Sequence, residues 1–195
     1  MSLWRKAHIS FGFFLLTAWF ALANGWRLLV MVLFAAALHE LGHWAVLRLM
    51  GVRIGGLRLG VCGAELEMDS AALSYGGELA AVVAGPGMNL LCAMLLARLG
   101  WETAAGAHLI LGGFNLLPVR PLDGGQALCL ALSWMVGPTA GEGIARIVGT
   151  VTALVIAGML AGVMTASGGS LWLLPPLCGM LVSACREVRG FFPEK

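Results

Sequence analysis

Two histidines separated by one helical turn, with a glutamate beside the first, are the residues best suited to chemistry in this chain. They lie in the run from His39 through Glu40 to His43, which has the pattern HExxH. In a helix, positions i and i+4 share one face, so both imidazoles can reach one zinc ion. Glu40 can then act as the base that activates a water molecule. A pair of core histidines hydrogen-bonded to neighbouring helices is the alternative.

The surroundings of this run favour the chemical interpretation. HExxH lies inside an apolar stretch that extends from Leu28 to Met50, long enough to cross a bilayer. An acidic residue at the centre of such a helix costs roughly 3 kcal/mol on insertion. A cost of this size indicates that Glu40 and its neighbouring histidines serve a function.

The composition indicates an integral membrane protein. Of the 195 residues, 59% are hydrophobic and 11% are charged, against about 25% charged in ordinary soluble domains. The apolar runs are long and do not alternate, so the fold is predicted to be helical rather than a barrel. A net charge of +2 gives no support for a nucleic-acid partner. The five cysteines form no CxxC pair, which argues against a disulfide framework and a second metal site.

The pattern predicts an all-α polytopic membrane protein, a single membrane-embedded domain over residues 1–195. Between the second and third spans, residues 52–69 alternate in polarity around a glycine pair, which predicts a small sheet of two or three strands; an ordinary loop is the alternative. Lysines and arginines concentrate on one side, which predicts that both termini are cytoplasmic. About six spans are expected, at residues 9–24, 28–50, 78–99, 103–136, 144–165 and 171–184.

The fourth span is too long for one crossing and is broken in its middle. The break holds Asn115, Arg120, Pro121 and Asp123 among two prolines and two glycines. Unwound backbone at membrane depth lines protein or water rather than lipid. Counting residues at the helical rise places the break at a depth similar to HExxH. Asp123 can therefore supply a third zinc ligand, although it could also cap the helix that restarts there.

Three further polar residues are candidates for contacting the substrate or stabilising an oxyanion. Asn115 and Asn89 can donate hydrogen bonds to a developing negative charge. Asn89 could instead form an interhelical hydrogen bond. Arg120 could donate too, or could snorkel or pair with an acid. His8 and His108 are expected to be satisfied or interfacial histidines.

The sequence resembles the site-2 protease family of intramembrane zinc metalloproteases. The resemblance covers about half of the chain and three motifs in family order. It implies that His39, His43 and Asp123 bind zinc, that Glu40 is the catalytic base, and that the sheet pairs with an unwound substrate. Asn115 and Pro121 match positions near the substrate. The motifs are the HExxH run, the Ala84-Gly85-Pro86 run with Asn89, and the segment Asn115-Leu116-Leu117-Pro118-Val119-Arg120-Pro121-Leu122-Asp123-Gly124-Gly125.

Within that family the last motif resembles the branch of stage IV sporulation protein FB, which processes a pro-sigma factor. Two positions depart from that branch: residues 59–64 replace a Pro-Phe-Gly-Gly-like run, and Gln126 stands where arginine is common. No PDZ domain interrupts the motifs, and no CBS domain is expected after the last span.

The resemblance implies a bacterial cell-membrane endopeptidase that cuts a membrane-tethered regulator, with a possible membrane regulatory partner. A catalytically inactive scaffold, or a metal-binding membrane protein with the same helices, is the alternative.

Overall fold

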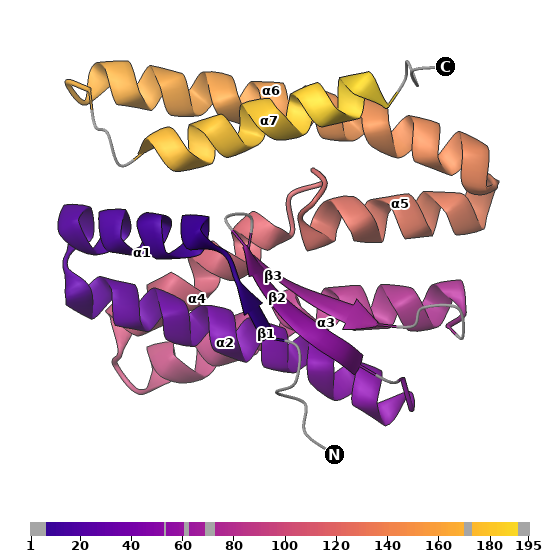
Figure 1. Cartoon of the computed structure of the whole chain (residues 1–195), viewed down its shortest axis with the longest axis horizontal. Coiled ribbons are helices and arrows are strands. Elements are labelled where there is room, and N and C mark those ends of the chain that lie inside the picture. The colour runs from indigo at the N-terminus through magenta and orange to yellow at the C-terminus, as the bar shows by residue number, and fades with distance from the viewer. Residues whose placement is uncertain (1–6, 53, 61–62, 69–72, 170–172, 191–195) are drawn as a thin grey trace. The chain divides into compact units, whose positions relative to one another are not determined.

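The structure is a computed structural model, and it describes residues 7–52, 54–60, 63–68, 73–169 and 173–190 (Figure 1). Several residues used in the sequence analysis lie outside these ranges. They include four of the charges used to predict the topology and the start of the expected sixth span, namely Arg5, Lys6, Arg53, Lys195 and Leu171. The chain divides into two compact units, Met1–Phe114 and Asn115–Lys195, which are described separately.

Unit 1 combines helices with a small sheet. Its helices α2 and α3 pack side by side, and both are long and apolar. α4 follows α3 and ends at the boundary of the two units. The elements are β1 (Ala7–Ile9), α1 (Phe11–Asn24), α2 (Trp26–Leu49), β2 (Ile54–Gly60), β3 (Gly63–Met68), α3 (Tyr75–Arg98) and α4 (Glu102–Asn115).

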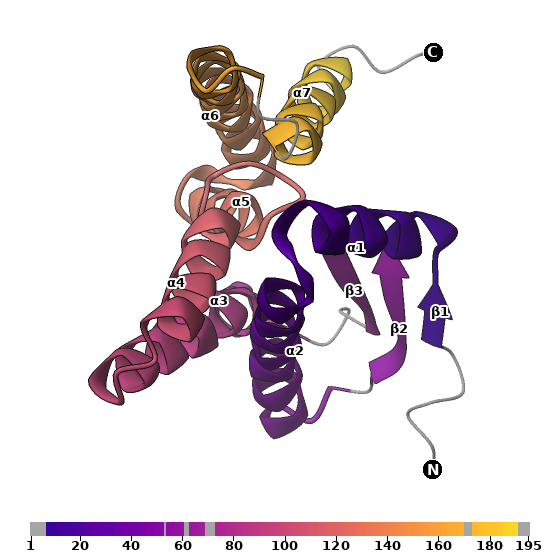
Figure 2. The same cartoon turned by 90° about the vertical axis from the view of Figure 1, so that its left-hand side faces the viewer.

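The three strands form one sheet in the order β1-β2-β3, with α1 beside it (Figure 2). β2 and β3 pair antiparallel, with Leu57 opposite Leu66, and occupy the segment whose alternation predicted strands. β1 pairs parallel to β2, with His8 opposite Arg58. The sequence analysis did not anticipate β1, because three residues are too few to show a period.

Local signals explain where the helices of unit 1 begin and end. Ser10 and Ser74 cap α1 and α3, each accepting a hydrogen bond from a backbone N–H three residues later. Gly25, at a φ of 86°, separates α1 from α2. The connection between the first two expected spans is therefore a single glycine, because α2 already begins at Trp26 rather than at residue 28.

Unit 2 contains α5 (Asp123–Val136), α6 (Pro138–Ala166) and α7 (Leu174–Arg189). α6 packs against both α5 and α7, and Figure 1 shows α6 and α7 running alongside one another. The buried face of α6 carries only small residues, which let neighbouring backbones approach closely. These residues are Gly141, Ala145, Gly149, Ala153 and Ala157.

Three described helices are long and apolar enough to cross a membrane by length and composition, namely α2, α3 and α6; α1 is a shorter apolar helix. The expected break of the fourth span is present, since α4 ends at Asn115 and α5 starts at Asp123. Two boundaries were wrong. α6 starts at Pro138 rather than residue 144, because proline suits the first helical turn. α7 continues to Arg189, five residues beyond the expected end of the sixth span at residue 184.

Candidate metal centre

α2 presents His39 and His43 together, as their spacing predicted. Their Nε2 atoms lie 3.1 Å apart. Two nitrogens bound to one tetrahedral zinc at the usual bond length lie about 3.3–3.4 Å apart, so the observed pair fits a shared zinc with a small adjustment. His39 is 5% exposed and Glu40, the next residue, is half-buried. The donor set therefore has the chemistry and the spacing of a zinc site.

Two glycines allow α3 to approach these histidines. A Cβ placed on Gly42 would meet the Ala84 carbonyl oxygen at 2.6 Å, so α2 and α3 touch through their backbones there. A Cβ on Gly85 would collide with the His43 ring and would lie 2.8 Å from His39 Nε2. Gly85 thus lies directly against the metal-binding nitrogens, where no larger residue fits. This role of Gly85 was not predicted from the sequence.

The two histidines are oriented by different partners. His43 Nδ1 lies 2.8 Å from the backbone carbonyl of Ala81. A carbonyl only accepts hydrogen bonds, so Nδ1 carries the proton and Nε2 keeps the lone pair that a metal requires. This contact could not be predicted from the sequence, because its partner on α3 is a main-chain carbonyl.

Asn89 and His108 continue the polar cluster from His39. Asn89 Nδ2 lies 3.2 Å from His39 Nδ1, and Asn89 Oδ1 lies 3.1 Å from His108 Nδ1. Asn89 is fully buried and His108 is 1% exposed. Gly112 permits this contact, since a Cβ there would lie 3.0 Å from the Asn89 Cβ. The expected interhelical hydrogen bond of Asn89 is confirmed, and His108 is a satisfied buried histidine.

Asp123 is the first residue of α5, in unit 2, and its side chain is half-buried. The N-cap position belongs to Leu122, so the alternative role of Asp123 as helix cap is wrong. The two residues that follow are glycines for a steric reason. A Cβ on Gly124 would collide with the backbone of Leu116 and Leu117, and one on Gly125 with that of Val119 and Arg120. The loop at 116–122 therefore folds tightly over the start of α5.

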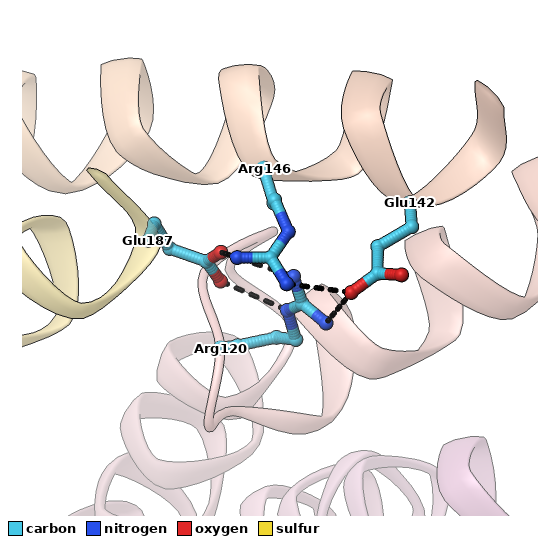
Figure 3. A network of polar contacts seen from close by, with 4 residues as sticks. All are labelled: Arg120, Glu142, Arg146 and Glu187. Carbon is cyan, nitrogen blue, oxygen red and sulfur yellow. Dashed lines mark hydrogen bonds and ion pairs between the residues drawn. The ribbon is translucent and has the colours of Figure 1, made fainter. Parts of the chain in front are cut away.

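Arg120 holds this loop within unit 2 through an ionic network (Figure 3). Its guanidinium donates two hydrogen bonds to Glu187 on α7, at 2.8 and 3.0 Å. Glu142 and Arg146 on α6 complete the network, joined to each other at 2.6 Å. The expected pairing of Arg120 with an acid is confirmed. Its partner Glu187 was missed, because it lies 67 residues further along the chain.

The remaining candidates lie at the ends of this loop region. Asn115 is the last residue of α4 and is half-buried. Pro121 is exposed and follows a cis peptide bond from Arg120. Both remain candidates for substrate contact.

Comparisons with known proteins agree with the chemistry of this site. No family model matches the chain. A zinc metalloprotease of Methanocaldococcus jannaschii is 33% identical over 144 residues, covering 67% of this chain and 42% of that protein. A protein of Mycobacterium tuberculosis named as zinc metalloprotease Rip3 is 31% identical over 163 residues, covering 74% of this chain and 41% of its own. The chain thus spans about two fifths of the length of these curated relatives.

A solved structure extends the similarity over nearly the whole chain. The site-2 protease from Methanocaldococcus jannaschii matches with a TM-score of 0.66 and 26% identity, covering 91% of this chain and 90% of that one. The findings support the site-2 protease family. They do not single out the sporulation branch within it. The relatives' names also support zinc as the metal and a metallopeptidase as the class of enzyme.

Proposed function

We propose that this chain is an intramembrane zinc endopeptidase, which hydrolyses a peptide bond in or near a transmembrane segment of a membrane-tethered protein. One observation carries the proposal. Two imidazole nitrogens converge at 3.1 Å on a helix apolar enough to cross a membrane, with Glu40 directly after the first histidine in the sequence. The similarity to zinc metalloproteases supports the same chemistry.

The proposed zinc ligands are His39, His43 and Asp123. The histidines offer their Nε2 atoms from α2, and Asp123 offers a carboxylate oxygen from the start of α5. Three protein ligands leave one coordination position open, which is typical of catalytic zinc. When bound, the metal would polarise the scissile carbonyl and lower the pKa of water.

Glu40 is the proposed general base. It directly follows His39 on α2, and its proposed role is that of a base rather than of a metal ligand. Its carboxylate would take a proton from the attacking water and later deliver it to the leaving amine. Among the oxyanion candidates, Asn89 contacts His39 and His108, and Arg120 donates to Glu187. Asn115 stays a candidate donor, and Pro121 a candidate for substrate contact.

The substrate is proposed to bind as an extended segment. A helix hides its peptide bonds, so a transmembrane substrate must unwind before water can attack. An extended segment can add to the edge of a sheet, and the sheet of unit 1 offers strands for such pairing. The sheet's expected role by family resemblance supports this mode.

The biological setting is proposed from the sequence. We infer six spans, both termini in the cytoplasm, and residence in a bacterial cell membrane. The substrate would be a regulator such as a pro-sigma factor, as in the sporulation branch, and a membrane partner would regulate the cut.

The decisive experiment compares wild type with Glu40→Gln. Both proteins are purified in detergent, their bound zinc is quantified, and cleavage of a membrane-tethered test substrate is measured. The variant should retain zinc and lose cleavage, because Glu40 is a base rather than a ligand. If the wild type binds no zinc, the alternative of an inactive scaffold replaces the protease. Equal cleavage by the two proteins would remove Glu40 from the mechanism.

A further inference from the structure

A line of buried polar side chains crosses three helices beside the proposed zinc site. It runs from His39 on α2 through Asn89 on α3 to His108 on α4, with contacts of 3.2 and 3.1 Å. These side chains are 5%, 0% and 1% exposed, so water does not mediate between them. We propose that Asn89, oriented by His108, is a positioning residue that holds His39 in the tautomer able to bind the metal. This inference rests on the proposed zinc site.

The position of the imidazole proton decides whether a histidine can bind the metal. A neutral histidine carries one N–H, so binding a metal through Nε2 requires the proton on Nδ1. For His43 that requirement is met by the Ala81 carbonyl, which can only accept. For His39 the group at Nδ1 is the Asn89 amide, which can accept through Oδ1 or donate through Nδ2. Unlike His43, His39 therefore faces a partner that permits either tautomer.

The two orientations of the amide have opposite consequences. The structure has Nδ2 toward His39; in this orientation Asn89 donates to Nδ1, and the His39 proton lies on Nε2, where it faces His43 Nε2 at 3.1 Å, so zinc binding requires the opposite orientation. That proton would occupy the position of the metal. With Oδ1 toward His39, Nδ1 donates to Asn89 and Nε2 is available. Amide oxygen and nitrogen are nearly equal in size, so a half-turn exchanges the roles without moving the neighbours.

His108 selects between these orientations. In the structure its Nδ1 lies 3.1 Å from Asn89 Oδ1, so the zinc-bound protein would need a half-turn of this amide. If His108 carries its proton on Nε2, its Nδ1 accepts from Asn89 Nδ2, and Oδ1 is turned toward His39. If its proton lies on Nδ1, the amide turns the other way. The tautomers of His39 and His108 are thereby coupled through Asn89, although no atom of His108 is a proposed ligand.

The test is a double-mutant cycle on zinc affinity. The full chain is purified in detergent, and its zinc affinity is measured by competition with a chelator. Asn89→Leu, which removes the acceptor, should weaken zinc binding about 10–100-fold, as loss of a hydrogen-bond partner of a metal ligand does. Asn89→Asp should stay close to wild type, because a carboxylate accepts from Nδ1 in any orientation.

The second arm of the cycle isolates His108. His108→Phe keeps a ring beside Phe34 but removes the nitrogen that orients the amide. It should weaken zinc binding in the wild-type background and have no effect in the Asn89→Asp background, since a carboxylate needs no orienting. An equal loss of zinc affinity in both backgrounds would make His108 a packing residue and overturn the relay, that is, the coupling of His108 to His39 through Asn89. Unchanged affinity in Asn89→Leu would overturn it too.

Nitrogen-15 NMR supplies a readout that packing would not change. The chain has four histidines, so their tautomers can be assigned by substitution. In the zinc-loaded protein, His39 should carry its proton on Nδ1 and His108 on Nε2. A proton on Nδ1 of His108 would contradict the relay. Thermal unfolding in the presence of chelator checks that each variant folds. Absence of zinc binding in the wild type would refute the proposed function itself, whereas normal wild-type binding with unaffected variants would refute only the relay.

Discussion

Gly85→Ala places one methyl group where the proposed zinc ligands converge. The new Cβ would lie 2.8 Å from His39 Nε2 and closer still to the His43 ring. Ordinary van der Waals contact begins at 3.4 Å, so His39 Nε2 must move by about 0.6 Å. Metal–ligand distances tolerate only about 0.2 Å, so at least one imidazole must leave the metal-binding position. The substitution thus changes a residue that packs against the proposed ligands, and none of the ligands themselves.

The expected loss of zinc affinity is on the order of 100-fold or more, the upper end of what loss of a ligand's hydrogen-bond partner costs. This corresponds to about 2.8 kcal/mol at 1.4 kcal/mol for each tenfold change. The apoprotein should suffer less. Alanine favours a helix over glycine by about 1 kcal/mol, which partly offsets an overpacking cost of about 1–3 kcal/mol.

The matched control is Gly87→Ala. Gly87 lies on the same helix, and a Cβ there would meet nothing within 4 Å. It should bind zinc like the wild type and unfold at the same or a slightly higher temperature. Zinc affinity is measured by chelator competition, and cleavage with a test substrate. If Gly85→Ala binds zinc as tightly as Gly87→Ala, the metal does not lie between these two histidines and α3.

Three further outcomes are expected. Glu187→Gln should lower the free energy of unfolding, measured by chemical denaturation, by about 2–3 kcal/mol. This is less than for a fully buried pair, because the Arg120 side chain is 31% exposed. Glu142→Gln should cost less than about 1 kcal/mol, because the Glu142 side chain is 46% exposed. A zinc chelator should abolish cleavage, and zinc alone should restore it. Zinc at 100 times its dissociation constant should raise the free energy of unfolding by about 2.7 kcal/mol. Cleavage that survives complete metal removal would contradict the mechanism. Gly112→Ala should weaken zinc binding by pushing α4 away from Asn89. Gly113→Ala should leave zinc affinity unchanged, because a Cβ there meets open space. Equal zinc affinities of the two variants would show that α4 does not support the site.

Much of the site could be predicted because its signals are local. His39 and His43 are four residues apart on one helix, so helical geometry alone brings the two imidazoles together, and Glu40 directly follows the first. The broken fourth span was also predictable, since prolines and glycines cluster in it. The paired strands β2 and β3 occupy the segment of period-two alternation.

The missed features depend on contacts between distant segments. The Ala81 carbonyl that orients His43 belongs to the backbone, which every residue shares, so no residue type marks it. Glu187 lies beyond the expected end of the last span, and only the packing of α7 reveals its contact with Arg120. His108 looked like an isolated histidine because its partner Asn89 lies 19 residues away on another helix. Gly85 stood out only as a small residue, and its role depends on which atoms face it.

The buried face of α6 shows how such a fold can persist while its sequence changes. At Gly149, a Cβ would come within 3.2 Å of the Pro118 carbonyl oxygen, so the size of that residue is constrained by backbone. On other faces of the same helix, Ile147, Val151 and Leu154 are each more than half exposed. Those side chains need only be apolar where they meet lipid. Substitutions should accumulate freely there and rarely on the small-residue face, so a few positions could preserve the packing of α6 across distant relatives whose overall identity is low.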